Sequence, residues 1–470
     1  MNNIFLEPSS YRSKNSSVYI GDNYVFRKVN RIKEEEIKLF INSDFFKKNK
    51  NKLIETKILK DEEIKKFELQ NFANTNQYLW LQHKKLNQIT YPYEWCFEQL
   101  KDAAIFHLEL NIEAIKNDFQ LSDATAYNIQ FFNQKPIFID ITSFEKLKKN
   151  SYWSGYKQFC EQFYGPLLLS SKANLEHFNI YKGNFNGIDL KIISKCLPFT
   201  SWFNFRILAN IHFHSYLNEK NDSQSHLAIK NKKIRGLSKN AYLNILKGLM
   251  NEIKKLKLKN KTYWSNYAKN TSYTNDDILK KKQIVKKFIN DNNISSLCDV
   301  GCNTGEYSVS AFEAGVKNIV GLDLDGYSLN LSYNNLTKKN FDFTPLYFDI
   351  ANPTPNLGWR LEERKSFHKR FNSKFDGLIC LAVIHHVCIA KNVPEDQFID
   401  FLLSLSKNIL LEFIPKKDMM VKNLLKLRED IFHDYNYDKL VDLIEKKAKI
   451  NFVENLSNSE RVLISITKNE

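Results

Sequence analysis

The sequence contains few cysteines, and none of them form a close pair. Seven are spread over 470 residues, namely Cys96, Cys160, Cys196, Cys298, Cys302, Cys380 and Cys388. An odd number without a CxxC spacing argues against both a disulfide framework and a zinc site. We therefore expect reduced, mostly buried thiols, including Cys302, which lies inside the glycine motif described below.

Long hydrophobic runs are also missing. The apolar stretch at residues 378–387 is far shorter than the roughly 20 residues that a membrane helix needs. Residues 1–8 contain neither a basic segment nor a sustained apolar one, so they do not resemble a signal peptide. We expect a cytoplasmic protein without a membrane span.

Acidic residues are outnumbered by basic ones, and the formal net charge is +16. A basic surface gains affinity for nucleic acid by releasing counterions from phosphates, and the aromatic residues Trp264 and Tyr267 suit the same partner. Lysine and asparagine are abundant throughout, however, so solvated helix faces explain the charge equally well. No RNA-binding module is recognisable, and nucleic acid is therefore the less favoured partner.

A chain of this length is too long for one ordinary core. We expect an N-terminal α+β domain over residues 1–170, a helical connector over residues 171–279 and an α/β domain over residues 280–470. Most of residues 150–290 has the composition of helices and polar loops.

Short patterns indicate the elements of the N-terminal part. Residues 17–29 alternate around Gly21, which predicts a hairpin. Residues 61–119 have apolar side chains at helical spacing, which predicts helix. Residues 128–132 and 136–141 flank a polar turn and predict a second hairpin.

The C-terminal third alternates between strand-like and helical segments. Strands are expected at residues 296–300, 318–324, 342–348, 375–381 and 408–413. This alternation predicts a doubly wound α/β fold, with a mostly parallel sheet covered by helices on both faces.

A glycine motif follows the first of these strands, with the sequence Asp299-Val300-Gly301-Cys302-Asn303-Thr304-Gly305. Glycine suits a tight turn from strand to helix where a ligand approaches the backbone. The motif resembles motif one of class I methyltransferases, although Asn303 stands where many members have glycine. The resemblance implies a Rossmann-like domain that binds S-adenosylmethionine through Asp299, Gly301, Asn303 and Gly305.

Other residues complete the cofactor site that we expect. Asp323 ends the second strand, where a carboxylate can accept hydrogen bonds from both ribose hydroxyls, and Asp325 is close enough to compete. Asp349 ends the third strand, at the position that the resemblance places near the adenine amine. Leu381, after the fourth strand, belongs to the same expected set.

Three residues are candidates for catalysis. His385 and His386 follow the fourth strand, where a neutral histidine could accept a proton from an oxygen or nitrogen nucleophile. The alternative is that the pair caps the strand and packs against the cofactor. Glu412 ends the fifth strand and could face the acceptor, or else form a salt bridge with a lysine.

A second constellation lies in the N-terminal part. Asp123, Asn128 and Asp140 resemble the catalytic-loop and metal-binding residues of protein kinases and aminoglycoside phosphotransferases. In that interpretation the N-terminal α+β domain is kinase-like and the protein is bifunctional, with phosphotransferase and methyltransferase parts. Asp123 is then the base, and Asn128 and Asp140 hold a metal. Lys28 could pair with a phosphate, with an ordinary surface lysine as the alternative. A glycine-rich phosphate loop is missing, and the alternative is that both acids only hold the hairpin through backbone hydrogen bonds.

The sequence as a whole resembles the nodulation-protein (NoeA)-like class I methyltransferases of bacteria. The resemblance rests on residues 91–95, 121–128, 138–141, the glycine motif and residues 412–418. It implies methyl transfer from S-adenosylmethionine to an oxygen or nitrogen acceptor. A saccharide or another small molecule is the acceptor that the analogy suggests.

Overall fold

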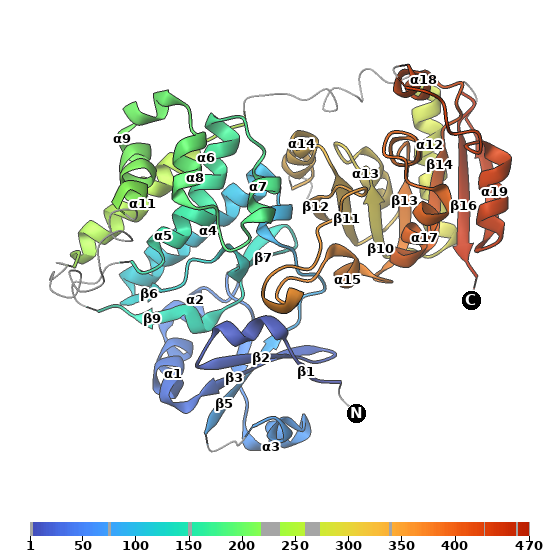
Figure 1. Ribbon diagram of the computed structural model, residues 1–470. Coiled ribbons are helices and arrows are strands. Elements are labelled where there is room, and N and C mark those ends of the chain that lie inside the picture. Colours follow the sequence, from blue (N-terminus) through green and yellow to red (C-terminus); the bar gives the residue numbers. More distant parts are fainter. Residues whose placement is uncertain are drawn as a thin grey trace. The chain divides into compact units, whose positions relative to one another are not determined.

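The computed structural model describes most of the chain, namely residues 3–73, 77–148, 153–217, 236–258, 273–337, 341–426, 428–456 and 459–469. It divides into two compact units (Figure 1). Unit 1 comprises Met1–Tyr93, Leu100–Lys259 and Asn356–Arg364, and unit 2 comprises Glu94–Gln99, Asn260–Pro355 and Lys365–Glu470. Among the described residues, no helix is both long enough and apolar enough to cross a bilayer.

Unit 1 begins with a five-stranded antiparallel sheet in the order β1-β2-β3-β5-β4. Its strands are β1 (Phe5–Leu6), β2 (Ser16–Ile20), β3 (Tyr24–Asn30), β4 (Thr56–Ile58) and β5 (Tyr78–Lys84). The turn between β2 and β3 is closed by a 2.9 Å hydrogen bond from the Gly21 amide to the Tyr24 carbonyl. The hairpin predicted around Gly21 is confirmed.

Short helices accompany this sheet. They are α1 (Glu34–Asn42), α2 (Asp44–Lys48) and α3 (Asp61–Lys66). The helical prediction for residues 61–119 is wrong in its middle, because β5 is a strand that pairs with both β3 and β4. Leu79 to His83 are all buried, and a strand buried on both faces loses the alternation that distinguishes it from a helix.

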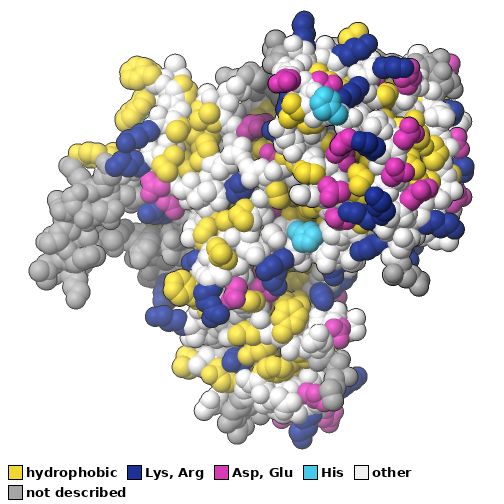
Figure 2. All heavy atoms as spheres, turned by 45° about the vertical axis from the view of Figure 1, so that its right-hand side comes forward, with side chains coloured by type: hydrophobic (Ala, Val, Ile, Leu, Met, Phe, Trp, Pro, Cys, Tyr) yellow, Lys and Arg dark blue, Asp and Glu magenta, His cyan; other side chains and the backbone are white. Residues whose placement is uncertain are grey.

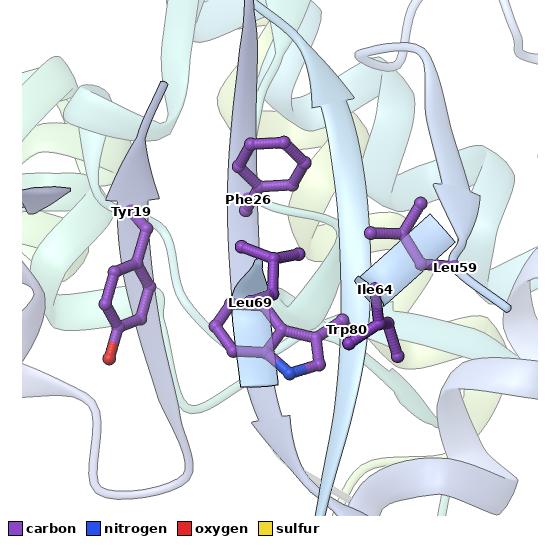
Figure 3. Close-up of a cluster of buried hydrophobic side chains, with 6 residues drawn as sticks. All are labelled: Tyr19, Phe26, Leu59, Ile64, Leu69 and Trp80. Atoms are coloured by element: carbon purple, nitrogen blue, oxygen red, sulfur yellow. The ribbon is translucent and has the colours of Figure 1, made fainter. Parts of the chain in front are cut away.

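A cluster of buried side chains stabilises one face of this sheet (Figure 3). Its members are Tyr19, Phe26, Leu59, Ile64, Leu69 and Trp80. The rings of Tyr19 and Trp80 lie with their centroids 5.3 Å apart in a tilted arrangement, which adds to the energy of area burial. The strands and α3 are therefore held together by one aromatic core.

The rest of unit 1 is mainly helical. Two short ladders, β6 (Phe119–Leu121) with β9 (Phe144–Lys146) and β7 (Ile129–Phe132) with β8 (Lys135–Phe138), follow α4 (Phe97–Lys116). The second ladder confirms the predicted hairpin. The helices are α5 (Tyr156–Phe159), η7 (Cys160–Tyr164), α6 (Gly165–Lys172), α7 (His177–Gly183), α8 (Leu190–Cys196), η8 (Phe199–Phe203), α9 (Phe205–Ile207), η9 (Leu208–Phe213) and α11 (Lys239–Lys255).

Unit 2 contains a seven-stranded sheet in the order β12-β11-β10-β13-β14-β16-β15. The strands are β10 (Ser296–Val300), β11 (Asn318–Asp323), β12 (Asp342–Tyr347), β13 (Phe375–Cys380), β14 (Ser406–Phe413), β15 (Ala448–Asn455) and β16 (Val462–Lys468). The first five are parallel, as predicted. β16 and β15 are antiparallel additions that were not predicted, so the sheet is mixed.

Helices flank and connect the strands of unit 2. They are α12 (Asn275–Asp291), α13 (Glu306–Glu313), α14 (Gly326–Thr337), α15 (Phe367–Phe371), α16 (Ile384–Cys388), α17 (Glu395–Leu405), α18 (Met419–Leu425) and α19 (Tyr437–Glu445). The chain moves outward from β10 to β12 and then returns to continue from β13 to β14 in the opposite direction. Right-handed crossovers therefore place α13 and α17 on opposite faces of the sheet.

The reversal of strand order marks the expected position of a ligand site. In open α/β sheets, ligands bind outside the carboxyl ends of the strands at the point where the strand order reverses. In unit 2 this point lies between β10 and β13. This is the Rossmann-like arrangement of class I methyltransferases, and it confirms the fold class expected for the C-terminal part.

Replacing Leu69 with alanine tests the core of unit 1. Leu69 is fully buried in the aromatic cluster, so we expect Leu69→Ala to lower the free energy of unfolding by about 2–5 kcal/mol. The control is Ile32→Ala at an exposed position, which should change it by about 0.5 kcal/mol or less. Urea unfolding followed by circular dichroism measures both, and equal stabilities of the two variants would contradict the assigned core.

Candidate functional site

The turn from β10 into α13 forms the centre of the candidate site. The backbone amides of Gly301 and Cys302 both donate to the Leu322 carbonyl of β11, at 2.8 and 3.0 Å. Gly301, Asn303 and Gly305 have φ angles of 77°, 47° and 83°. This left-handed region is open to glycine and tolerated by asparagine, which explains why Asn303 fits a position where many class I methyltransferases have glycine.

Close neighbours make both glycines necessary. A Cβ atom on Gly301 would lie 2.3 Å from Cγ2 of Val383, in the loop after β13. A Cβ on Gly305 would lie 2.7 Å from Cδ1 of Leu336 in α14. The turn is therefore packed directly against segments that follow the neighbouring strands.

Asp323 lies beside this turn at the end of β11. Its carboxylate accepts hydrogen bonds from the backbone amides of Asn303 (2.7 Å) and Asp325 (2.8 Å). Burial raises the pKa of Asp323 to about 6. Both of these donors are backbone amides, so the carboxylate keeps acceptor capacity for a ligand with hydroxyl groups.

Asp325, the alternative candidate for the ribose-binding acid, has its carboxylate at the start of α14. Its carboxylate accepts from the Tyr327 amide at 3.1 Å and from the Ser328 hydroxyl at 2.7 Å, both at the start of α14. These are the contacts of a helix cap. The geometry therefore favours Asp323 over Asp325 as a ligand-facing acid.

The other expected cofactor residues are distributed around the same turn. Asp299 is buried, accepts a 2.6 Å hydrogen bond from the Ser308 hydroxyl, and has its pKa raised to about 7 by burial. This hydrogen bond joins β10 to α13. Asp349 follows β12 and accepts from the Ala351 amide at 3.0 Å, and Leu381 is buried just after β13.

The two histidines lie at the start of α16. His385 is fully buried, and within the described part of the chain neither of its ring nitrogens has a hydrogen-bond partner. The His386 ring lies with its centroid 4.0 Å from that of His385. Burial, aided by Arg461, lowers the pKa of His386 to about 4 and that of His385 well below its ordinary value. Both rings are neutral near pH 7, but a group with so low a pKa is a weak base.

Glu412 lies in a buried ion pair. Its carboxylate is 2.8 Å from the Lys281 ammonium of α12 and accepts from the Tyr273 hydroxyl at 2.8 Å. Arg461 lies 3.9 Å away and also pairs with Asp418 at 2.8 Å. Both Glu412 and Lys281 are almost completely shielded from solvent. The structure therefore shows the salt bridge that was the alternative to a catalytic role.

Comparison with known proteins identifies the family. No protein-family model matches the chain. Nodulation protein NoeA of Rhizobium meliloti (strain 1021) is 36% identical over 392 residues, which cover 83% of this chain and 82% of that protein. The chain belongs to the NoeA family. This confirms the resemblance inferred from the sequence motifs.

Two further similarities are partial. The tRNA U34 carboxymethyltransferase of Helicobacter pylori (strain G27) is 31% identical over 90 residues, which are 19% of this NoeA-family chain and 30% of that enzyme. The crystal structure of the N-methyltransferase NodS from Bradyrhizobium japonicum has a TM-score of 0.31 at 10% identity. The match covers 42% of this chain and 98% of NodS.

Unit 1 of the NoeA-family chain brings the second constellation together. The Asn128 amide nitrogen lies 3.4 Å from the Asp123 carboxylate, and the same amide reaches the Ser143 hydroxyl at 3.3 Å. Ser143 in turn donates to Asp140 at 2.9 Å. Burial raises the pKa of Asp123. The three candidate residues therefore belong to one hydrogen-bonded group.

The cation of this group is Arg27. Its guanidinium lies 2.8 Å from the Asp140 carboxylate and donates to the Thr142 hydroxyl at 2.8 Å. Burial acts to raise the pKa of Asp140, but Arg27 and the nearby hydroxyls outweigh it and lower the pKa. The Lys28 ammonium lies over the rings of Tyr19 and Tyr78, and Arg27 is the cation beside Asp140. Within the described residues, no group of three or more His, Cys, Asp and Glu side chains is arranged to hold a metal.

Sequence reasoning missed the residues around Glu412, although one signal was present. Lys281 lies in the buried stripe of α12, with Ile284, Val285 and Phe288. A lysine at such a position predicts a buried partner of opposite charge, because an unpaired charge there is too costly. Tyr273 and Arg461 lie outside any recognisable motif.

Removing the Glu412 carboxylate tests its structural role in this NoeA-family chain. Glu412→Leu leaves Lys281 buried without its partner, so we expect the free energy of unfolding to fall by about 3–5 kcal/mol. The double variant Lys281→Met/Glu412→Leu should recover most of this loss because it removes both charges. Urea unfolding monitored by circular dichroism compares the three proteins. If Glu412→Leu is as stable as the wild type but inactive, the carboxylate acts in catalysis and the structural assignment fails.

Proposed function

We propose that this NoeA-family chain is an S-adenosylmethionine-dependent methyltransferase that acts in the cytoplasm on an oxygen or nitrogen acceptor. The observation that carries the proposal is the glycine turn after β10, with the Asp323 carboxylate beside it at the reversal of strand order. The seven free cysteines are in keeping with a reducing compartment.

The chemistry of these residues fits the proposed cofactor. An ionised Asp323 is an acceptor for the two hydroxyls of a ribose. Asp349, at the end of the adjacent β12, supplies a polar side chain for the adenine amine, and Leu381 supplies an apolar surface. Asp299 stabilises the turn by accepting a hydrogen bond from the Ser308 hydroxyl of α13. We assign Gly301, Asn303 and Gly305 to the backbone that the cofactor approaches.

The chain contributes mainly positioning to the reaction. When bound, S-adenosylmethionine supplies a methyl group on a positively charged sulfur. The protein must hold the acceptor atom in line with that methyl group, at roughly 3 Å, and must accept a proton from the nucleophile. We assign the proton to the neutral His386, with His385 packed behind it. Glu412 contributes by fixing β14 to α12.

We propose a saccharide or another small molecule as the acceptor. The loop after β13 has the sequence 381–386 Leu-Ala-Val-Ile-His-His in place of an Asn/Asp-Pro-Pro-Tyr motif, which argues against methylation of a nucleic-acid base. The similarity to a tRNA-modifying enzyme covers only 90 residues. Trp264 and Tyr267, which motivated the nucleic-acid hypothesis, lie outside the described residues.

Substituting Asp323 tests the cofactor site. We expect Asp323→Asn to weaken the binding of S-adenosylhomocysteine at least about tenfold, because an amide oxygen accepts less strongly than a carboxylate and the amide NH2 repels hydroxyl donors. Isothermal titration of the full-length protein measures the dissociation constant. The matched control is Asp325→Asn, which should stay within about threefold of wild type because Asp325 caps α14.

The same experiment has a pH signature. Protonation of Asp323 removes the charged acceptor, so wild-type affinity should fall as the pH decreases through about 6, the raised pKa of this group. The Asp323→Asn variant should lack that decrease. Equal affinities for wild type and Asp323→Asn at pH 8 would refute the assignment of the ribose acid.

We propose phosphotransferase chemistry in unit 1 as a second candidate function. The favouring observation is the grouping of Asp123 and Asn128, which lie between β6 and β7, with Asp140, which follows β8, as in a kinase-like arrangement. Arg27 argues against it, because this cation already neutralises Asp140 and a magnesium ion would have to displace it.

Nucleotide binding decides this second candidate. If unit 1 is a phosphotransferase, the protein should bind a magnesium–ATP complex in isothermal titration, and Asp140→Ala should weaken that binding at least about tenfold by removing a metal ligand. Asp118→Ala, at an exposed carboxylate, is the control and should bind as wild type does. Absence of magnesium–ATP binding in the wild type would remove the candidate.

A further inference from the structure

Unit 1 exposes an unusual set of aromatic side chains on consecutive elements. Phe199, Trp202, Phe203 and Phe205, on η8 and α9, are 75%, 46%, 79% and 80% exposed. We call these four residues the aromatic tip. Phe213, Tyr216 and Leu217 continue the exposed apolar surface along the chain. Hydrophobic side chains gather on the corresponding upper end of unit 1 in the space-filling view (Figure 2).

The backbone beneath the aromatic tip is firmly held. The His212 ring stacks on Trp202 with centroids 4.1 Å apart and planes at 8°. Its two nitrogens lie within hydrogen-bond distance of the hydroxyls of Ser194 (2.7 Å) and Ser201 (2.8 Å). The Asn204 side chain caps α9 by accepting from two backbone amides. The exposure is therefore a property of an ordered surface.

The described segment that carries the aromatic tip is basic in sequence. Residues 190–217 contain Lys191, Lys195 and Arg206 but no aspartate or glutamate. Two acidic side chains contact this segment: Glu252 of α11 lies 3.6 Å from Arg206, and Asp189 caps α8. Lys191 and Lys195 are exposed, so the surface beside the aromatic residues is basic.

We propose that the aromatic tip docks unit 1 onto an anionic lipid bilayer. Aromatic side chains beside lysines and arginines are the composition of peripheral membrane-binding surfaces, in which the rings enter the interface and the cations attract anionic headgroups. Side chains that are three-quarters exposed project from the surface, and a bilayer accepts projecting side chains without a matching hollow. The proposal does not depend on methyl transfer.

Vesicle flotation of the full-length protein tests the proposal. Wild type should float with vesicles of phosphatidylcholine and phosphatidylglycerol at 0.1 M salt, and should float less well with pure phosphatidylcholine or at higher salt. The triple variant Phe199→Ser/Phe203→Ser/Phe205→Ser should reduce the partition coefficient at least about tenfold, because it removes the inserting apolar surface. Lys191→Glu/Lys195→Glu should reduce it on the anionic vesicles only.

The matched control replaces three exposed apolar residues elsewhere, as Ile32→Ser/Leu279→Ser/Leu361→Ser, and should float as wild type does. Unchanged melting temperatures show that the variants are folded, and the lysine variant tests the proposal if the aromatic variant is not. Failure of wild type to bind anionic vesicles overturns the proposal. So does sedimentation of wild type as a dimer that the aromatic substitutions convert to monomer, because a second copy then covers the surface.

Discussion

The turn from β10 into α13 is the constraint on which the candidate site depends. Within five residues the chain must leave the sheet, place two amides on the Leu322 carbonyl and begin a helix. Three left-handed residues, Gly301, Asn303 and Gly305, make this path available. Val383 and Leu336 pack where side chains would otherwise stand. The turn therefore contacts the ends of both neighbouring strands, Leu322 of β11 and Val383 after β13, at the position where the strand order reverses.

Buried carboxylates around this point fall into two classes. Glu412 is paired with Lys281 and approached by Arg461, so its charge is compensated inside the protein. Asp323 accepts hydrogen bonds from the backbone amides of Asn303 and Asp325, and burial raises its pKa. A buried carboxylate held by backbone amides can also accept hydrogen bonds from a ligand with hydroxyl donors. The distinction explains why Asp323 is the better candidate for binding and Glu412 for structure.

The sequence predicts unit 2 better than unit 1, for physical reasons. Parallel strands buried on both faces give apolar runs bounded by helices, and the expected range for β10 matches the observed strand. β15 and β16 were missed because they are antiparallel neighbours at the edge of the sheet. The alternation of strand and helix, which indicates parallel strands, does not extend to such a pair. In β3, neighbouring side chains point to opposite faces, so Arg27 reaches Asp140 whereas Lys28 lies over the rings of Tyr19 and Tyr78. Ion pairs between distant elements, such as Lys281 with Glu412, leave a trace in sequence only at the buried lysine.

The titration of the site separates binding from proton transfer. His386 has a pKa near 4, so it is already neutral throughout the range in which the protein would work. Asp323 and Asp299, with pKa values of about 6 and 7, are the groups in the candidate site that change charge closer to neutrality. An activity that declines in mild acid therefore points to the cofactor-binding carboxylates and not to the histidine. Since a base of pKa 4 accelerates proton transfer only modestly at neutral pH, most of the rate enhancement must come from how the glycine turn and the loop after β13 position the two reactants.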